Sequence, residues 1–168
     1  GAGDSPQARI RLRPAGWHAF NIARVEAGTP LYNIDFGEQS LPAETGVLRD
    51  RVHFRKGCYL GQEVVARMDA LGKPKQMLVA LRFDHARTGG IVQPMPGAHV
   101  MAVADDAAET VGAVTSSTIS PMLGGEAIAF AQLRTKFAED PAARLEVAAE
   151  GARVRATVQP TLRFWTRP

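Results

Sequence analysis

Apolar residues follow a helical spacing in the first half of the chain and a strand-like spacing in the second. Residues 7–13 alternate polar and apolar positions, which predicts a strand with one solvated face. Residues 15–27 predict a helix, and Gly28, followed by Pro30, ends it. The expected buried stripe of this helix consists of Trp17, Phe20, Ala23 and Ala27.

A second helix is predicted over residues 62–71, with Gly72 at its end. Its expected buried stripe is Val64, Met68 and Leu71. Glu63 and Arg67 lie four residues apart and are expected to pair on its surface. Between the two helices, residues 29–55 are rich in turn-forming residues, and a stretch of this length is usually functional or held against another domain.

From about residue 76 the pattern changes to short strands separated by glycine, proline and aspartate turns. The predicted strands are 77–83, 99–104, 111–117, 127–133, 145–149 and 154–158. Six short strands at this spacing indicate a small antiparallel β-barrel or a jelly-roll-like sandwich. We therefore expect an α+β protein with a first domain over residues 1–74 and a β domain over residues 75–168, the boundary lying at residues 72–75.

Composition and charge narrow the function classes. The chain has 168 residues, 45% of them hydrophobic, which is enough for one sizeable core or two small ones. Its net charge is +3, and residues 1–75 hold all of the excess, 11 Lys and Arg against 8 Asp and Glu. That charge would suit an anionic ligand, but no recognised nucleic-acid motif accompanies it, and direct nucleic-acid binding is not expected. No apolar run is long enough for a membrane-spanning helix.

The single cysteine lies in the most distinctive segment, residues 56–63 (Lys-Gly-Cys-Tyr-Leu-Gly-Gln-Glu). One cysteine excludes an internal disulfide and fits a reducing compartment. Lys56 and the start of the following helix would favour the thiolate of Cys58, which makes it a candidate reactive or ligand-facing thiol. The alternative is a small buried apolar side chain.

Glu26 is the other candidate, near the end of the first predicted helix. It follows Ile22 by one turn and so lies beside apolar surface, whereas Arg24, two residues earlier, points to the opposite side. A carboxylate in that setting is either paired or awaits a hydrogen-bond donor. A salt bridge or a surface charge is the alternative. The four histidines lack metal-ligand spacing, and residues 115–117 have no neighbouring base for a serine nucleophile and are expected to end a strand.

These segments resemble a known family. The resemblance is carried by residues 56–63, by residues 24–30 with Tyr32 and Asp35, and by residues 111–117 with Ser120, Pro121 and residues 127–131. The first segment matches the signature of the YgfZ-type folate-binding proteins, which are relatives of the glycine-cleavage T-protein (aminomethyltransferase). The resemblance runs from about residue 10 to 165 and implies part of a T-protein-like folate-binding region followed by the C-terminal barrel of that superfamily. It also implies a further N-terminal region as a partner.

The resemblance implies a folate-dependent accessory factor for iron–sulfur cluster assembly or repair, supporting cluster enzymes such as tRNA-modifying ones, rather than a turnover enzyme. Cys58 would be the working thiol, with Lys56 beside it. A single cysteine cannot hold a stable cluster, so any iron–sulfur cluster would be transient and shared with assembly proteins or client enzymes. By carry-over, the residues that contact tetrahydrofolate would be Glu26, Arg24, Tyr59, Gly61, Gln62 and Glu63.

The alternative is a tetrahydrofolate-dependent, aminomethyltransferase-like enzyme for one-carbon transfer. Cys58 and Gln62 separate the two hypotheses, because the corresponding T-protein segment lacks the cysteine and carries an arginine at the position of Gln62. The expected compartment is the bacterial cytoplasm, with the mitochondrial matrix as the alternative.

Overall fold

The computed structural model describes residues 13–54, 57–85, 89–104 and 107–165. For residues 68–71 it describes the backbone but not the side chains. The strand predicted over residues 7–13 therefore lies, except for Arg13, outside the described residues. So do Lys56 and the side chains of Met68 and Leu71.

Helical elements gather in the first part of the chain and strands in the second, as the sequence pattern predicts. The helical elements are α1 (Trp17–Glu26), η1 (Pro42–Thr45), α2 (Leu48–Arg51), α3 (Gln62–Leu71), η2 (Pro121–Leu123) and α4 (Thr135–Ala138). The strands are β1 (Gln76–Asp84), β2 (His99–Ala104), β3 (Ala107–Ser120), β4 (Glu126–Arg134), β5 (Leu145–Ala149) and β6 (Ala152–Val158).

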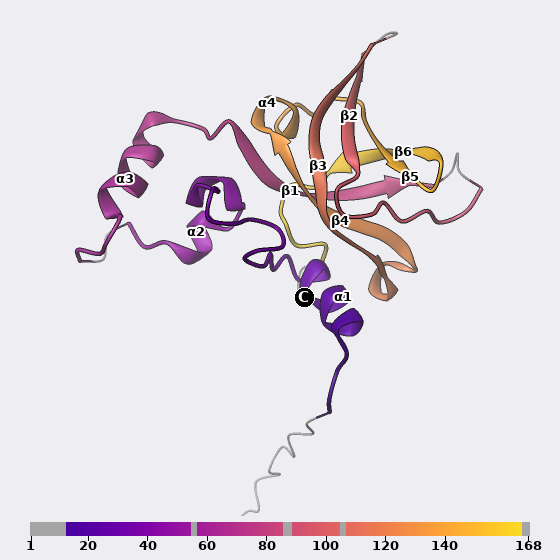
Figure 1. The fold of residues 1–168 in the computed structure, drawn as a ribbon, viewed down its shortest axis with the longest axis horizontal. Helices are drawn as coiled ribbons and strands as arrows, with labels where there is room; N and C mark the ends of the chain where they lie inside the picture. The colour runs from indigo at the N-terminus through magenta and orange to yellow at the C-terminus, as the bar shows by residue number, and fades with distance from the viewer. Residues whose placement is uncertain (1–12, 55–56, 86–88, 105–106, 166–168) are drawn as a thin grey trace, which may run out of the picture.

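The strands close into an antiparallel barrel (Figure 1). Their order around it is β1-β4-β3-β2-β5-β6, and β1 closes the ring by pairing with β6 from Leu81 to Asp84. The predicted small antiparallel barrel is thus confirmed. Closure leaves none of these strands with an open hydrogen-bonding edge.

Two hydrophobic clusters lie on opposite faces of β1 and β4. One fills the barrel and takes residues from all its strands, among them Leu81, Val114 and Ala129. The other covers the outer face and joins Leu78 and Phe130 to residues beyond the barrel: Val25, Val47, Leu123, Leu162 and Phe164. Because successive strand residues point to opposite faces, burial on both sides produces the continuous buried runs 78–81 and 127–131.

Gly112 allows β3 and β4 to approach closely. A Cβ built at this position would lie 2.0 Å from the backbone oxygen of Gln132 and 2.6 Å from Cδ2 of Leu133. Every other residue type would therefore force these paired strands apart.

β3 is longer than predicted. Residues 115–117 were expected to end a strand, and this is wrong, because the pairing with β4 continues to Ser120. The register shifts between Val114 and Ser116. Such a bulge re-aims the side chains around it, and here those side chains meet α1 and the loop that follows α1.

α1 packs against β3 and β4, but with a face other than the predicted one. Trp17 and Phe20 were expected to be buried and are 62% and 45% exposed. The buried residues of α1 are Arg24, Val25 and Glu26. Apolar spacing alone predicted the wrong buried face for this helix, because the face that is buried consists largely of polar groups with hydrogen-bonding partners inside the protein.

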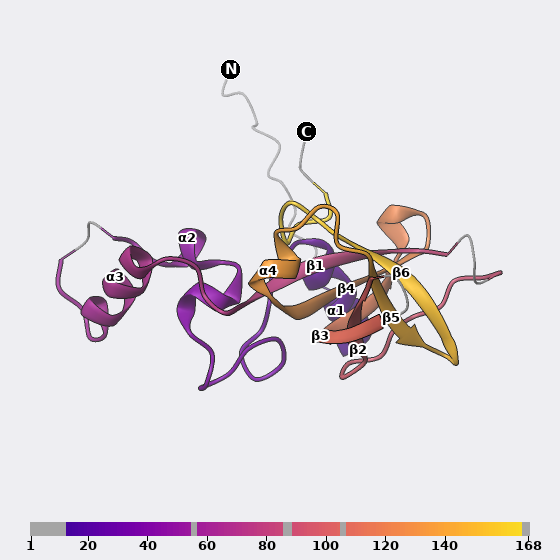
Figure 2. The same cartoon turned by 90° about the horizontal axis from the view of Figure 1, so that it is seen from above.

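α3 and the segment leading into it stand away from the barrel, on the far side of α2 (Figures 1 and 2). Val64, expected in a buried stripe, is 58% exposed. The predicted pair of Glu63 with Arg67 is absent from the ion pairs of the described residues. Within the described part of the chain, no helix has the length and apolar character needed to cross a bilayer.

Candidate functional site

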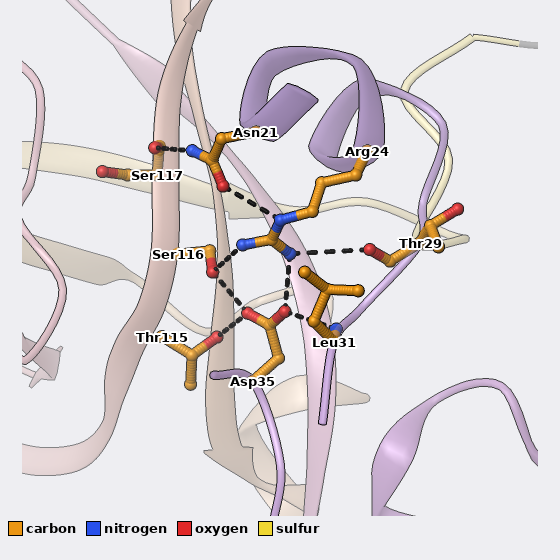
Figure 3. A network of polar contacts seen from close by, with 8 residues as sticks. All are labelled: Asn21, Arg24, Thr29, Leu31, Asp35, Thr115, Ser116 and Ser117. Carbon is orange, nitrogen blue, oxygen red and sulfur yellow. Dashed lines mark hydrogen bonds and ion pairs between the residues drawn. The ribbon is translucent and has the colours of Figure 1, made fainter. Parts of the chain in front are cut away.

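Arg24 lies at the centre of a buried polar network between α1, the following loop and β3 (Figure 3). Its guanidinium donates from Nη1 to Oδ2 of Asp35 at 2.6 Å and from Nη2 to Oγ of Ser116 at 2.6 Å. Nε donates to Oδ1 of Asn21 at 2.9 Å, and Nη1 also reaches the backbone oxygen of Thr29 at 3.5 Å. Almost all of the donor capacity of Arg24 is therefore used inside the protein.

Asp35 completes this network as its only carboxylate. Besides Arg24, Asp35 accepts from the backbone N–H of Leu31 at 2.9 Å and from the hydroxyls of Thr115 and Ser116 at 2.8 and 2.6 Å. Neighbouring residues of a regular strand point to opposite faces, and the bulge in β3 is what lets Thr115 and Ser116 reach one carboxylate.

The Arg24–Asp35 pair is buried, with side chains 3% and 0% exposed. A buried ion pair is stable where hydrogen bonds also satisfy its remaining donors and acceptors, and nearly all of them are satisfied here. Arg24 was predicted to contact a cofactor. The structure places its guanidinium between α1 and the barrel, where it orders the helix.

Glu26 has a different environment, although it is just as buried, at 5% exposure. Its Oε1 accepts from the hydroxyl of Ser120 and from the backbone N–H of Met122, the latter at 3.4 Å. Its backbone oxygen accepts from the N–H of Phe164, which attaches the C-terminal segment to the end of α1. Glu26 makes no ion pair with any residue that the structure describes.

Glu26 is thus neither a surface charge nor half of a salt bridge within the described ranges. A buried carboxylate costs free energy unless donors satisfy it. Ser120 and Met122 satisfy Oε1, whereas Oε2 makes no hydrogen bond with the residues described here. The arrangement is that of an acceptor with capacity left for a ligand that brings N–H donors.

Cys58 is exposed, and the alternative of a buried apolar cysteine is wrong in this structure. The residues around it are also accessible: Leu60 is fully exposed, and Tyr59 is 38% exposed. The Oε1 atom of Gln62 accepts from the backbone N–H of Tyr59 at 3.3 Å, so Gln62 orders the turn that presents the thiol. Gly61, with φ of 88°, sits in the left-handed region that side chains other than glycine rarely adopt.

A shallow hollow lies beside Cys58, lined by residues 58–64 and Ala66. Apolar side chains form much of it, including the exposed Leu60 and Val64. Contiguous exposed apolar groups of this kind are typical of surfaces that meet other molecules.

The structure separates the predicted site residues into two groups. Arg24 and Glu26 lie at the junction of α1 with β3, whereas Cys58, Tyr59, Gly61, Gln62 and Glu63 lie with α3 at the far end of the molecule (Figures 1 and 2). Among the described residues, no cluster of three or more His, Cys, Asp or Glu side chains could hold a metal ion.

Sequence reasoning missed the polar partners that β3 supplies. Ser116 and Ser120 were seen as parts of a resembling segment, with no contact assigned to either. The pairing of Asp35 with Arg24, 11 positions apart, carries no local signature. A signal was nevertheless present, because several hydroxyl residues in one strand need hydrogen-bonding partners if that strand is buried.

Known proteins resemble this chain over much of its length. An aminomethyltransferase from Moorella thermoacetica is 34% identical over 113 residues, which are 67% of this chain and 28% of that protein. An aminomethyltransferase from Saccharopolyspora erythraea is 33% identical over 144 residues, 85% of this chain and 36% of that protein. The tRNA-modifying protein YgfZ from Colwellia psychrerythraea is 36% identical over 74 residues, 44% of this chain and 23% of that protein.

The chain thus spans about a third or less of the length of these relatives. Among solved structures, the aminomethyltransferase T of the glycine cleavage system from Bartonella henselae matches with a TM-score of 0.68 at 20% identity, over 87% of this chain and 38% of that one. At this identity the match shows the fold. Residues 77–164, just over half of the chain, match the glycine cleavage T-protein C-terminal barrel domain. The chain belongs to the glycine cleavage T-protein C-terminal barrel family.

Proposed function

We propose that this chain takes part in tetrahydrofolate binding and that Glu26 holds the pterin ring. The observation that carries the proposal is a buried carboxylate with two neutral donors and no cationic partner among the described residues. Relatives named aminomethyltransferase support the same ligand.

The chemistry of the pterin ring fits Glu26. A pterin presents an amino group and a ring N–H side by side, and a carboxylate accepts from such a planar donor pair. An uncharged acceptor would form weaker bonds, since hydrogen bonds to ionised groups are the stronger ones. Tetrahydrofolate, when bound, supplies the nitrogen atoms that carry a one-carbon unit.

Arg24 supports Glu26 without touching the ligand in this proposal. Its bonds to Asp35 and Ser116 fix α1 on β3, and this contact sets where Glu26 meets Ser120, four residues further along the same strand. Tyr59, Gly61, Gln62 and Glu63 lie away from Glu26, so we assign them to the surroundings of Cys58 rather than to the pterin.

The activity that the comparisons favour is aminomethyltransferase-like one-carbon transfer to tetrahydrofolate. The two relatives named aminomethyltransferase match 67% and 85% of the chain, against 44% for the relative named YgfZ. In this activity the residues of the chain bind and orient tetrahydrofolate, with Oε1 of Glu26 held by Ser120 and Met122.

The test is a titration of the wild-type protein and of Glu26→Gln with tetrahydrofolate. Loss of a hydrogen bond to a charged group should weaken binding by about tenfold to a hundredfold. Glu139→Gln, which alters a carboxylate on the exposed surface, is the matched control and should bind as the wild type does. Equal affinity of wild type and Glu26→Gln would refute the proposal.

A second candidate function is the folate-linked accessory role in iron–sulfur cluster assembly or repair. The exposure of Cys58 beside apolar side chains favours it, because a thiol that exchanges ligands with a partner protein must be accessible. The segment over residues 56–63 also carries the resemblance to the YgfZ-type proteins.

The substitution Cys58→Ser separates the two candidate functions. One-carbon transfer should persist in Cys58→Ser and fail in Glu26→Gln if the protein is a transferase. If it is the accessory factor, Cys58→Ser should lower the activity of a cluster-dependent tRNA-modifying enzyme in cells while leaving tetrahydrofolate binding intact.

A further inference from the structure

We propose that Ser120 is a positioning residue for Glu26 and that it thereby makes this site selective for rings with paired N–H donors. The inference rests on the proposed function of Glu26 as the pterin acceptor. It adds the residue that orients the acceptor and the class of ring that the site rejects.

The direction of the Ser120 hydroxyl proton follows from its partners. The oxygen of Ser120 accepts from the backbone N–H of Leu123 at 3.2 Å, and the hydroxyl donates to Oε1 of Glu26. Ser120 is completely buried, so no solvent molecule competes for this proton. A hydroxyl that already accepts from one side directs its proton to the other acceptor, which is Glu26.

The backbone around Ser120 is also fixed. Ser120 caps η2, and its backbone oxygen accepts from the N–H of Gly125 at 2.9 Å. Pro121 follows at the first position of η2, where its restricted φ stabilises the turn. The second donor to Glu26, the N–H of Met122, belongs to this turn as well.

The β3–η2 turn therefore holds Oε1 of Glu26 from two atoms and leaves Oε2 for a ligand. Without Ser120 the glutamate side chain would regain rotational freedom, and the acceptor would no longer have one position. A site built around a fixed acceptor rejects a ring that lacks the matching donor, since two facing acceptors leave a buried polar group unpaired.

Two small rings test this selectivity. 6-Methylpterin carries the amino group, whereas 6-methyllumazine carries a carbonyl oxygen in its place and would present an acceptor to Glu26. We expect the wild-type protein to bind 6-methylpterin more tightly than 6-methyllumazine. In Ser120→Ala the ratio of the two dissociation constants should fall by about tenfold, which corresponds to about 1.4 kcal/mol. Ser120→Thr, which keeps the hydroxyl, should restore the ratio.

Thr118→Val is the matched control, because Thr118 is buried in the same strand and its hydroxyl has only a 3.5 Å contact with the backbone oxygen of Ile119. This variant should keep the wild-type preference. Thermal unfolding of each variant, without ligand, reports its folded fraction.

The outcomes separate this inference from the proposed function. If Glu26→Gln loses the preference and Ser120→Ala keeps it, the role of Ser120 is refuted and that of Glu26 stands. If Ser120→Ala weakens the binding of both rings equally, Ser120 is merely structural and the inference fails. If the wild type shows no preference for 6-methylpterin, the proposed function fails, and this inference fails with it.

Discussion

The junction of α1 with β3 and the segment around Cys58 present their functional groups in opposite ways. At the junction, Arg24 and Glu26 are buried and bonded to hydroxyls of one strand. In the segment, Cys58 and Leu60 are exposed, and α3 stands away from the barrel. The difference teaches that the residues most distinctive in the sequence are exposed, whereas the residues that hold the carboxylate of Glu26 are ordered by the fold itself.

The largest effect on stability is expected from Asp35→Ala. Removing this carboxylate leaves Arg24 charged, buried and unpaired, which should lower the free energy of unfolding by about 3–5 kcal/mol. Glu139→Ala is the control, because its pair with Lys73 is exposed and should be worth less than about 1 kcal/mol. Urea unfolding measures both, and a small effect of Asp35→Ala would contradict the structural role of the network.

Gly112→Ala should come next. Its Cβ would overlap the backbone of β4, and such overpacking costs about 1–3 kcal/mol. Gly57→Ala, in the Cys58 segment, meets no atom within 4 Å and should be close to neutral. Thermal unfolding of these two variants compares the barrel with the projecting segment directly. Equal shifts in Tm would contradict the expected difference in packing between the two regions.

Cys58→Ser should change stability by less than about 0.5 kcal/mol, because an exposed side chain contributes little packing. The thiol should react with iodoacetamide in the native protein about as readily as in urea. A native-state rate many times slower than the rate in urea would mean that the segment is covered in solution.

The smallest effect concerns pH. The hydrogen bond from Arg134 lowers the pKa of Glu109 below its ordinary value of 4.5. A lowered pKa in the folded state means that the ionised carboxylate stabilises the fold above the unfolded-state pKa, and that this contribution disappears as pH falls through the folded-state pKa. Glu109→Gln should therefore flatten the acid side of the stability profile slightly, and superimposable urea-unfolding profiles of the two proteins would refute the coupling.

The barrel could be predicted from the sequence because its strands depend on local patterns. Strands 99–104 and 145–149 have the predicted bounds, and the turns between strands carry their own glycine and aspartate signals. β3 extends beyond the predicted strand 111–117 at both ends, because its pairing with β2 begins at Ala107 and its pairing with β4 continues to Ser120.

The site could be predicted only in part. Residue types and their surroundings made Glu26 and Cys58 candidates, and their roles stay predictions. The contacts of Ser120 with Glu26 and of Asp35 with Arg24 span 94 and 11 positions of sequence, beyond the reach of any local pattern. The buried face of α1 was predicted wrongly for a related reason. Trp17 and Phe20 mark the apolar face, yet the helix buries the face whose polar groups find partners on β3.

The most direct test of the account is hydrogen–deuterium exchange of the protein with and without tetrahydrofolate. If Glu26 holds the pterin, the ligand should slow exchange at the end of α1 and in the turn around Met122, and leave residues 57–66 unchanged. Slower exchange confined to residues 57–66 would contradict the account, because the ligand would then bind at the Cys58 segment and not at the junction of α1 with β3.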